Sequence, residues 1–507
     1  MDDLKLTIDT FSTEDKKEFA YFMQRLKKKK DRKDYELFQL LQQKKNYKPQ
    51  EIISRLYPHE PNAGAYYALR KRLMQHLTNY ILLQRLAQDP TAGSSIMGML
   101  SLARYLFEVR ADRLAWSMLR KAERLAAANE QFDLLNAVYN LQIEKADSEY
   151  ADPLTDLIRK RNENKITADE DERANIANSL IAQQLASARA QGRDLQFDTT
   201  IRKVLQTYGL TAAVSQRPAL LYKLMSIARS AVLARKDFFS FEPYIIQQYQ
   251  LATANHGFSP AHQYYKVNLL YMIAHVLYRN RKFNQSNDYL DELAAALRGE
   301  AKSYFPALYA KYVFLKTANG AFQRNLSPSI ALLEKLITTQ ANLLTPRDML
   351  TARLGLSFLY FAQGAYHKAN DVLQYLNHSD KWCERLMGKE WVLKKNLGEI
   401  LIQYELSNLD LALNKVKALE RSFKILLAQP IYKNVGAFLQ LLSQLIQQPD
   451  AATRKAFFRH VETTLEFVPL EKEDLQAISY YAWLKSKMVS RSYYEVLLEL
   501  AGYPPIQ

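Results

Sequence analysis

The stretch YFAQGAYHKANDVL, residues 360–373, decides the fold of this chain. Its second half places a small residue, Ala369, four positions before Leu373 and seven before Leu376. Residues at these spacings share one face of an α-helix. The small side chain lets this helix approach a neighbouring helix closely, and the two leucines then pack between the two helices. The pattern therefore predicts a pair of closely packed helices.

The same small–apolar–apolar pattern recurs along the chain at a nearly constant distance. Its copies are Ser286-Leu290-Leu293, Ser329-Leu333-Leu336, Ala369-Leu373-Leu376 and Ala412-Val416-Leu419. The first residues of successive copies lie 43, 40 and 43 positions apart, and Ala115 begins an earlier match. A fixed period of this length indicates a repeat array, in which each helix pair buries its apolar face against its neighbours.

One copy of this pattern contains enough further residues of a known repeat motif to suggest a protein family. It reads Tyr-x3-Gly-x-Tyr-x2-Ala-x3-Leu through Tyr360, Gly364, Tyr366, Ala369 and Leu373. This motif resembles the tetratricopeptide repeat, and the resemblance implies that Gly364 and Tyr366 mark the turn between the two helices. A degenerate copy runs from Leu277 to Leu290, and the resemblance covers about residues 95–440. The period of about 42 departs from the family's 34 residues, which implies longer helices or longer connections.

The composition agrees with a helical chain. The sequence has 14 Gly and 16 Pro among 507 residues, so tight turns are few. No run alternates strictly with β-branched residues, as strands would require. Segments between turn signals such as Asn319-Gly320 have helical length and predict about twenty helices. We therefore expect an all-α protein, an α-solenoid of helix pairs preceded by an N-terminal helical domain; the alternative is an irregular helical bundle.

The first 90 residues differ from the rest of the chain. Ser12 and Asp15 predict a capping box at the start of a helix whose apolar face includes Phe19. The opening is similar to the start of a family of uncharacterised bacterial helical-repeat proteins, a resemblance that implies a fold and no activity. The residues that carry it are Leu6, Phe11, Ser12, Asp15, Lys16, Lys17, Phe19, Tyr35, Leu37, Phe38 and Tyr47.

The order of elements in this segment is that of a helix-turn-helix module. A helix over 37–41 is followed by a turn at 46–49, a short helix over 50–56 and a long helix over 65–83. In DNA-binding modules the longer basic helix reads the major groove. Here Arg70 and Arg72 are not cleanly opposite the apolar stripe of the long helix. A helical cap domain is therefore the competing interpretation.

The chain is basic, with a net charge of +16 and a pI of about 9.4. Closely spaced cations bind phosphates, so the basic residues of the N-terminal segment are candidate anion or nucleic-acid contacts. They are Lys27, Lys28, Lys29, Lys30, Arg32 and Lys33, with Arg70, Lys71 and Arg72 in the long helix. The alternative is a solvated helix end, where cations are favoured by the helix dipole, on a chain whose charge is dilute.

The sequence contains no recognisable catalytic or metal-binding motif. It has no GxxxxGK[ST] or GxGxxG loop, and its eight His residues are scattered. Cys383, the one cysteine, has no histidine at motif spacing and is expected to be a buried, inert thiol. The acidic run 169–172 is expected to form the N-terminal turn of a helix, where anions are stabilised. We therefore expect no enzyme activity, no cofactor and no metal.

These patterns divide the chain into three predicted regions: a basic N-terminal helical domain (1–90), a tetratricopeptide-like α-solenoid (91–440) and a C-terminal helical cap (441–507) over the last exposed seam. The first residues lack a secretory signal, and no stretch approaches the roughly 20 apolar residues that span a bilayer. With a single cysteine, this favours the cytoplasm.

The expected function is that of a non-catalytic adaptor, which binds a protein or peptide on the surface of the solenoid. The alternative is a nucleic-acid-binding regulator, in which the basic N-terminal module contacts nucleic acid and the solenoid acts as a sensor or dimerisation domain.

Overall fold

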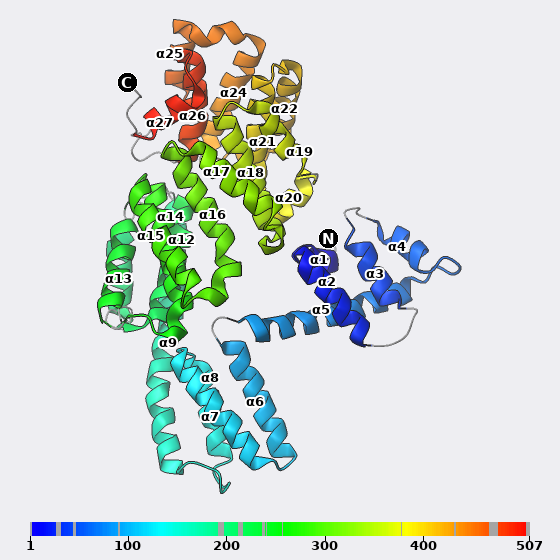
Figure 1. The fold of residues 1–507 in the computed structure, drawn as a ribbon, viewed down its shortest axis with the longest axis vertical. Helices are drawn as coiled ribbons and strands as arrows, with labels where there is room; N and C mark the ends of the chain where they lie inside the picture. Colours follow the sequence, from blue (N-terminus) through cyan, green and yellow to red (C-terminus); the bar gives the residue numbers. More distant parts are fainter. Residues whose placement is uncertain are drawn as a thin grey trace. The chain divides into compact units, whose positions relative to one another are not determined.

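The structure is a computed structural model that describes residues 3–26, 32–43, 47–89, 92–190, 197–210, 216–235, 239, 241–255, 257–376, 378–429, 432–465 and 475–502. These residues form 26 α-helices and no β-strand (Figure 1). Helices that follow one another in sequence pack together, so the architecture consists of sequential helix pairs. The predicted all-α class is confirmed. No helix within the described ranges is long and apolar enough to cross a bilayer.

The chain folds into two compact units. The first contains Met1–Met272 and Ala295–Phe305, and the second contains Ile273–Ala294 and Pro306–Gln507. The division runs through helices α14 (Gln263–Arg279) and α15 (Phe283–Arg298), so each of these helices contributes to both units.

The first unit begins with five helices around an aromatic core. They are α1 (Asp3–Asp9), α2 (Thr13–Leu26), α3 (Lys33–Leu41), α4 (Pro49–Leu56) and α5 (Ala63–Gln88). The fully buried ring of Phe19 meets the rings of Phe38 and Tyr80 at centroid distances of 5.0 and 5.3 Å. The predicted capping box is confirmed, because the Asp15 N–H donates to the Ser12 hydroxyl at 3.0 Å and the Ser12 N–H donates to the Asp15 carboxylate at 2.9 Å. The predicted order of helix, short helix and long helix is also confirmed.

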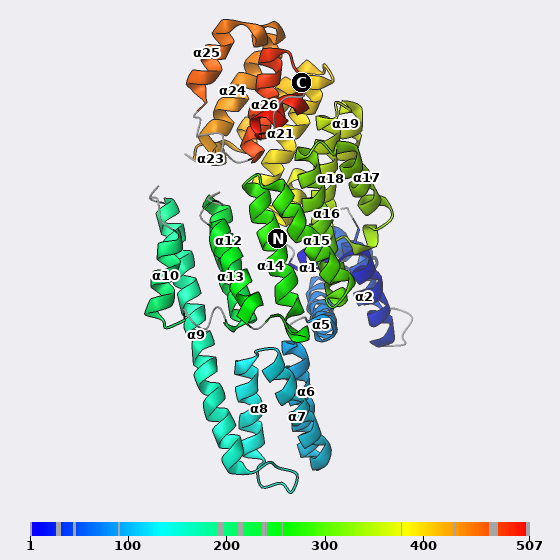
Figure 2. The ribbon, with the colours of Figure 1, turned by 60° about the vertical axis from the view of Figure 1, so that its left-hand side comes forward.

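The next helices of the first unit lie side by side, each packed on its predecessor (Figures 1 and 2). They are α6 (Gly93–Glu108), α7 (Asp112–Ala128), α8 (Phe132–Glu144) and α9 (Leu154–Ala190). The unit continues with α10 (Phe197–Thr207), α12 (Pro218–Arg235), α13 (Phe241–Asn255), η1 (Pro260–His262) and η2 (Lys302–Tyr304). The predicted helix start at residues 169–172 is wrong, because these residues lie inside α9. Glu170 and Asp171 pair instead with Arg217, so an arginine rather than a helix terminus offsets their charge.

The second unit contains the remaining helices around one continuous apolar core. They are α16 (Phe305–Phe322), α17 (Leu326–Thr338), α18 (Pro346–Ala362), α19 (Tyr366–Gln374), α20 (Asp380–Met387), α21 (Lys389–Glu405), α22 (Leu409–Ser422), α23 (Lys424–Leu427), α24 (Lys433–Gln447), α25 (Lys455–Thr464), α26 (Leu475–Val489) and α27 (Tyr493–Leu500), with the short turns η3 (Ala341–Leu343) and η5 (Pro449–Thr453). Cys383 is buried in this core, as predicted.

A residue with a positive φ angle recurs at the turn within four helix pairs, α14–α15, α16–α17, α18–α19 and α21–α22. These residues are Arg281, Arg324, Gly364 and Ser407, with φ values of 61, 65, 80 and 61°. They lie 43, 40 and 43 positions apart, and each precedes the small residue of the sequence pattern by five positions. At every turn the following N–H donates to the carbonyl five residues earlier at 2.8–2.9 Å, which is a helix-ending Schellman bond. The period found in the sequence is therefore present in the backbone.

The small residues of the pattern lie where paired helices approach closely. Ser286 is fully buried, and its hydroxyl donates to the carbonyl of Ala274 in the preceding helix at 2.7 Å. In the next pair, a Cβ atom at Gly320 would lie 2.3 Å from the hydroxyl oxygen of Ser329. The turn predicted at Asn319-Gly320 is wrong for this reason, since Gly320 lies inside α16 and makes room for α17.

Helices α26 and α27 form a C-terminal pair that contacts the turn ends of several earlier pairs. Arg281 donates to the Leu500 carbonyl at 3.4 Å, and the Tyr494 hydroxyl donates to the Ala321 carbonyl. Further along, the rings of Tyr493 and Phe361 lie 5.1 Å apart, and Trp483 donates to Glu405 at 2.6 Å. We expected residues 441–507 to cover the last seam of the array. The C-terminal pair makes these contacts with earlier pairs, and both the cap over the last helix pair and the division at residue 441 stay predictions.

Candidate binding cavity

A cavity of about 590 Å³ lies within the second unit. Helices α16, α18 and α21 supply most of its lining, and the C-terminal pair adds Ser479, Tyr480 and Tyr493. The aromatic residues of the lining are Tyr278, Phe314, Phe322, Phe358, Phe361, Trp391, Tyr480 and Tyr493. Its volume falls in the range of about 300–1,000 Å³ that is usual for ligand pockets, which are lined mainly by apolar and aromatic side chains.

Each of the three helices turns one stripe of side chains toward the cavity, at the spacing of a single helix face. The stripes are Phe314, Ala318 and Ala321 on α16; Thr351, Gly355 and Phe358 on α18; and Trp391, Lys394, Gly398 and Leu401 on α21. Large rings therefore alternate with residues that have little or no side chain. The cavity owes part of its width to these small residues.

Two glycines of the lining occupy the same place in successive helix pairs. Gly355 and Gly398 each lie nine residues before the positive-φ residue that ends their helix. A Cβ atom at Gly398 would meet nothing within 4 Å, and one at Gly355 would make an ordinary contact of 3.5 Å with a methyl group of Leu333. Neither glycine is therefore required by the packing of the unit itself.

The hydroxyl groups of the lining differ in whether they have a protein partner. Thr317 donates to the Phe314 carbonyl at 3.0 Å, and Ser357 donates to the Ala369 carbonyl at 2.9 Å. The ring of Tyr480 packs against Phe438 at a centroid distance of 5.6 Å, and its hydroxyl makes no hydrogen bond in the part of the chain that the structure describes. Burial raises the pKa of Tyr480, so this hydroxyl remains a hydrogen-bond donor.

The charged side chains of the lining are Glu390 and Lys394, one turn apart on α21. Their charges are opposite, so the lining carries no net charge. Nowhere in the described ranges do three or more His, Cys, Asp or Glu side chains form a group that could hold a metal ion. The arrangement can enclose and orient an apolar group, and it offers a phenol as donor.

The basic residues proposed from the sequence fall into three groups in the structure. Lys27, Lys28, Lys29 and Lys30 lie outside the described residues. Arg32 is almost buried, where it pairs with Asp34 at 2.7 Å and donates to the Met23 carbonyl, and Lys33 donates to the Leu56 carbonyl at 2.6 Å.

In the long helix α5, Arg70 donates to the Tyr66 hydroxyl at 3.2 Å, whereas Lys71 and Arg72 are exposed. The structure thus places Arg32, Lys33 and Arg70 in contacts within the N-terminal helices. Of the described candidates, Lys71 and Arg72 extend into solvent.

The five residues of the repeat signature surround the turn between α18 and α19. Gly364 takes the positive φ angle there, and Ala369 and Leu373 are buried beyond it. Tyr360 donates to Glu334, and burial together with that carboxylate raises the pKa of Tyr360 to about 12. Burial and the Glu405 carboxylate raise the pKa of Tyr366 to about 12 as well. Both phenols therefore stay protonated and act as packing and hydrogen-bonding groups.

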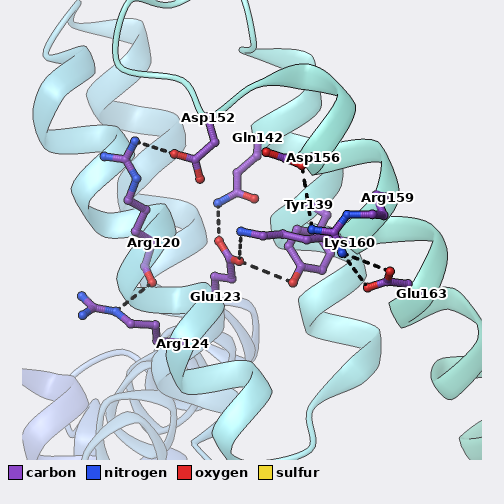
Figure 3. A network of polar contacts seen from close by, with 10 residues as sticks. All are labelled: Arg120, Glu123, Arg124, Tyr139, Gln142, Asp152, Asp156, Arg159, Lys160 and Glu163. Carbon is purple, nitrogen blue, oxygen red and sulfur yellow. Dashed lines mark hydrogen bonds and ion pairs between the residues drawn. The ribbon is translucent and has the colours of Figure 1, made fainter.

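A polar network between α7, α8 and α9 brings several charged groups together in the first unit (Figure 3). The Glu123 carboxylate accepts hydrogen bonds from Gln142 at 3.0 Å and Lys160 at 2.9 Å, and the Tyr139 hydroxyl lies 3.5 Å away. Burial and the charge of Glu123 raise the pKa of Tyr139 to about 12. These contacts join three helices and balance the charge of Glu123. The network therefore has a structural role: it holds α7, α8 and α9 together.

The fold and the cavity define an all-helical protein of sequential helix pairs with an aromatic-lined internal site. No protein-family model matches the chain, and a search of curated proteins finds no match.

Of the cavity lining, the repeat pattern includes Leu333 and Leu373, and no sequence motif marks the lining as a site. Gly355 and Gly398 offered a signal, because they are 43 positions apart and therefore share the repeat period. Tyr480 and Tyr493 each belong to a pair of adjacent tyrosines. Tyrosine suits both binding grooves and helix packing, so these pairs alone did not locate the site.

Proposed function

We propose that this protein is a non-catalytic cytoplasmic adaptor whose second unit binds an apolar segment of a partner protein or peptide in the cavity of α16, α18 and α21. The cavity is the observation that carries the proposal. Three helices from successive pairs each line it with one row of side chains. Ligand pockets are typically concave, mainly apolar and aromatic, and of about this volume. The size and aromatic lining of the pocket therefore favour a bound apolar group.

We also propose that the helix pairs are degenerate tetratricopeptide-like repeats stacked as an α-solenoid. The recurrence of the positive-φ turn at 43, 40 and 43 residues supports a repeating unit. In such an array the first helices of successive pairs share one side, and an elongated partner can contact several repeats at once. The rows of cavity-lining side chains on α16, α18 and α21 fit this arrangement.

Nucleic acid is the competing partner class. The contacts of Arg32, Lys33 and Arg70 within the N-terminal helices support a structural role for these side chains. The proposal therefore places recognition in the second unit and treats nucleic acid as one outcome of the test.

The test is a pull-down from native lysate, with and without nuclease, that uses wild-type protein and two leucine variants. Gly398→Leu fills the cavity, whereas Gly436→Leu is a matched control in α24, where a Cβ atom also meets nothing within 4 Å. We expect a protein that wild type and Gly436→Leu retain, that nuclease does not release and that Gly398→Leu loses. Retention that nuclease abolishes would favour the nucleic-acid regulator. Equal retention by all three variants would reject the cavity as the site.

A further inference from the structure

We propose that the group that enters the cavity is a main-chain segment: an uncharged, apolar peptide that lies over Gly355 and Gly398 and accepts a hydrogen bond from Tyr480 through a backbone carbonyl. This inference rests on the proposed function and specifies the partner of the same site. Its three parts come from separate observations on the glycines, the phenol and the charges of the lining.

The two glycines indicate close approach by another backbone. Both lie inside helices, where glycine is less favourable than alanine because it loses more conformational freedom on folding. The unit has room for a methyl group at each position. Besides widening the cavity, a glycine at such a position admits close approach by a second main chain. Gly355 and Gly398 occupy equivalent positions in successive helix pairs. Together they form a surface without side chains, the glycine floor of the cavity, that continues from one pair to the next.

The Tyr480 hydroxyl indicates a hydrogen-bond acceptor in the occupant. Its ring is held against Phe438, and its hydroxyl has no acceptor among the described residues, whereas Thr317 and Ser357 do. Tyr480 is half-buried in the lining, so an occupant that displaces water from the cavity has to supply an acceptor for its hydroxyl. A peptide carbonyl does so without bringing a charge into the cavity.

The charges of the lining indicate an uncharged occupant. Glu390 and Lys394 carry opposite charges one turn apart on α21, and the rest of the lining is uncharged, so the lining has no net charge. Charge complementarity therefore favours apolar side chains on the bound peptide. The rings of Phe314, Phe358 and Trp391 are placed to contact them.

The probe is a library of random peptides about twelve residues long, selected on the full-length protein, since peptides of this length supply several anchor side chains. The affinity of one selected peptide is then measured for wild type and for single variants. Gly355→Ala and Gly398→Ala each add one methyl group to the floor, and Gly436→Ala adds the same group outside the cavity. Tyr480→Phe removes the donor and keeps the ring.

We expect Gly398→Ala and Gly355→Ala to weaken binding by about tenfold, which is the effect of displacing a closely packed segment. Tyr480→Phe is expected to weaken binding by about fivefold, as for one lost hydrogen bond. Gly436→Ala should bind as wild type does. Thermal melting of every variant checks that its fold is intact.

The leucine and alanine variants separate this inference from the proposed function. If Gly398→Leu abolishes binding while both alanine variants and Tyr480→Phe bind like wild type, the cavity is the site but its occupant is not main chain, and this inference is wrong. If the library yields no peptide that binds wild type, or if Gly398→Leu binds as well as wild type, the proposed function and this inference both fail.

Discussion

The indole N–H of Trp483 donates a hydrogen bond of 2.6 Å to the carboxylate of Glu405, and the ammonium of Lys487 lies 2.6 Å from the same carboxylate. Trp483 is fully buried on α26, and Glu405 is the last residue of α21. One carboxylate therefore fixes the C-terminal pair to the helix that carries Gly398. This contact holds Tyr480 and Tyr493 in the wall of the cavity.

Replacing Trp483 by phenylalanine is expected to destabilise the second unit. The change removes a hydrogen bond to a charged group and leaves part of the indole site empty, which together cost about 2–3 kcal/mol. Urea denaturation of the full chain measures the effect. Trp382→Phe is the control, because Trp382 is half-buried and stacks on His378 at 3.8 Å, away from Glu405. Equal losses in the two variants would contradict a special role for the Glu405 contact.

The close contact of Gly320 with Ser329 predicts a coupled pair of mutations. A methyl group at Gly320 would lie 2.3 Å from the Ser329 hydroxyl oxygen, so Gly320→Ala is expected to cost about 2 kcal/mol through overpacking. Adding Ser329→Ala removes the oxygen and should restore most of that loss, so the two changes are not additive. Additive effects in the denaturation of the single and double variants would show that the helices are not in contact there.

The opposite result is expected at Gly398. A methyl group there meets nothing within 4 Å, so Gly398→Ala should gain about 1 kcal/mol from helix propensity alone. Thermal melting compares the variant with wild type. A lower melting temperature would mean that the fold itself needs Gly398. The glycine would then be no evidence for a bound ligand.

The N-terminal helices contain a buried charged group that makes their stability depend on pH. Arg32 pairs with Asp34 at 2.7 Å, and His76 lies 3.4 Å from Asp34. Burial raises the pKa of Asp34, but the hydrogen bonds and charge of Arg32 outweigh it and hold the pKa below its ordinary value of 3.8. Burial lowers the pKa of His76 below 6.5; Asp34 opposes this shift, and the charges of Arg32 and Arg72 add to it.

For both groups the unfolded chain binds a proton more readily than the folded chain, so stability falls as the pH decreases. The contribution of His76 is lost below about pH 6.5 and that of Asp34 below about pH 4. We expect faster amide exchange in α3 and α5 at about pH 5.5 than at about pH 7.5, after correction for intrinsic rates. His76→Gln should reduce this difference. An unchanged difference in that variant would rule out His76 as its source.

The sequence alone predicted the helices and their period because both depend on local spacing. Ala369 and Ser286 could be recognised as contact points, since a small residue at a fixed interval needs no knowledge of the distant chain. Gly320 misled the prediction because a glycine ends a helix in some settings and admits a neighbouring helix in others. The distance to Ser329 decides between these uses, and that distance is a tertiary property.

The cavity was beyond the reach of sequence reasoning for a similar reason. Its walls come from α16, α18 and α21, and it is completed by Tyr480 and Tyr493, which follow the end of α21 at Glu405 by 75 and 88 positions. No periodic pattern specifies that the C-terminal pair returns to these helices. Likewise, the acidic run 169–172 could not be linked to Arg217 until α9 and α12 were placed side by side.

The most direct test of the central claim is a calorimetric titration of a selected peptide into wild type, Gly398→Leu and Gly436→Leu, with all three shown to be folded. Tryptophan emission, compared between wild type and Trp391→Phe so that the part from Trp391 in the cavity lining is isolated from that of the other three tryptophans, provides a second readout. The account predicts that wild type and Gly436→Leu bind with the same affinity and that Gly398→Leu shows no binding. Binding of the peptide to Gly398→Leu with the wild-type affinity would contradict it.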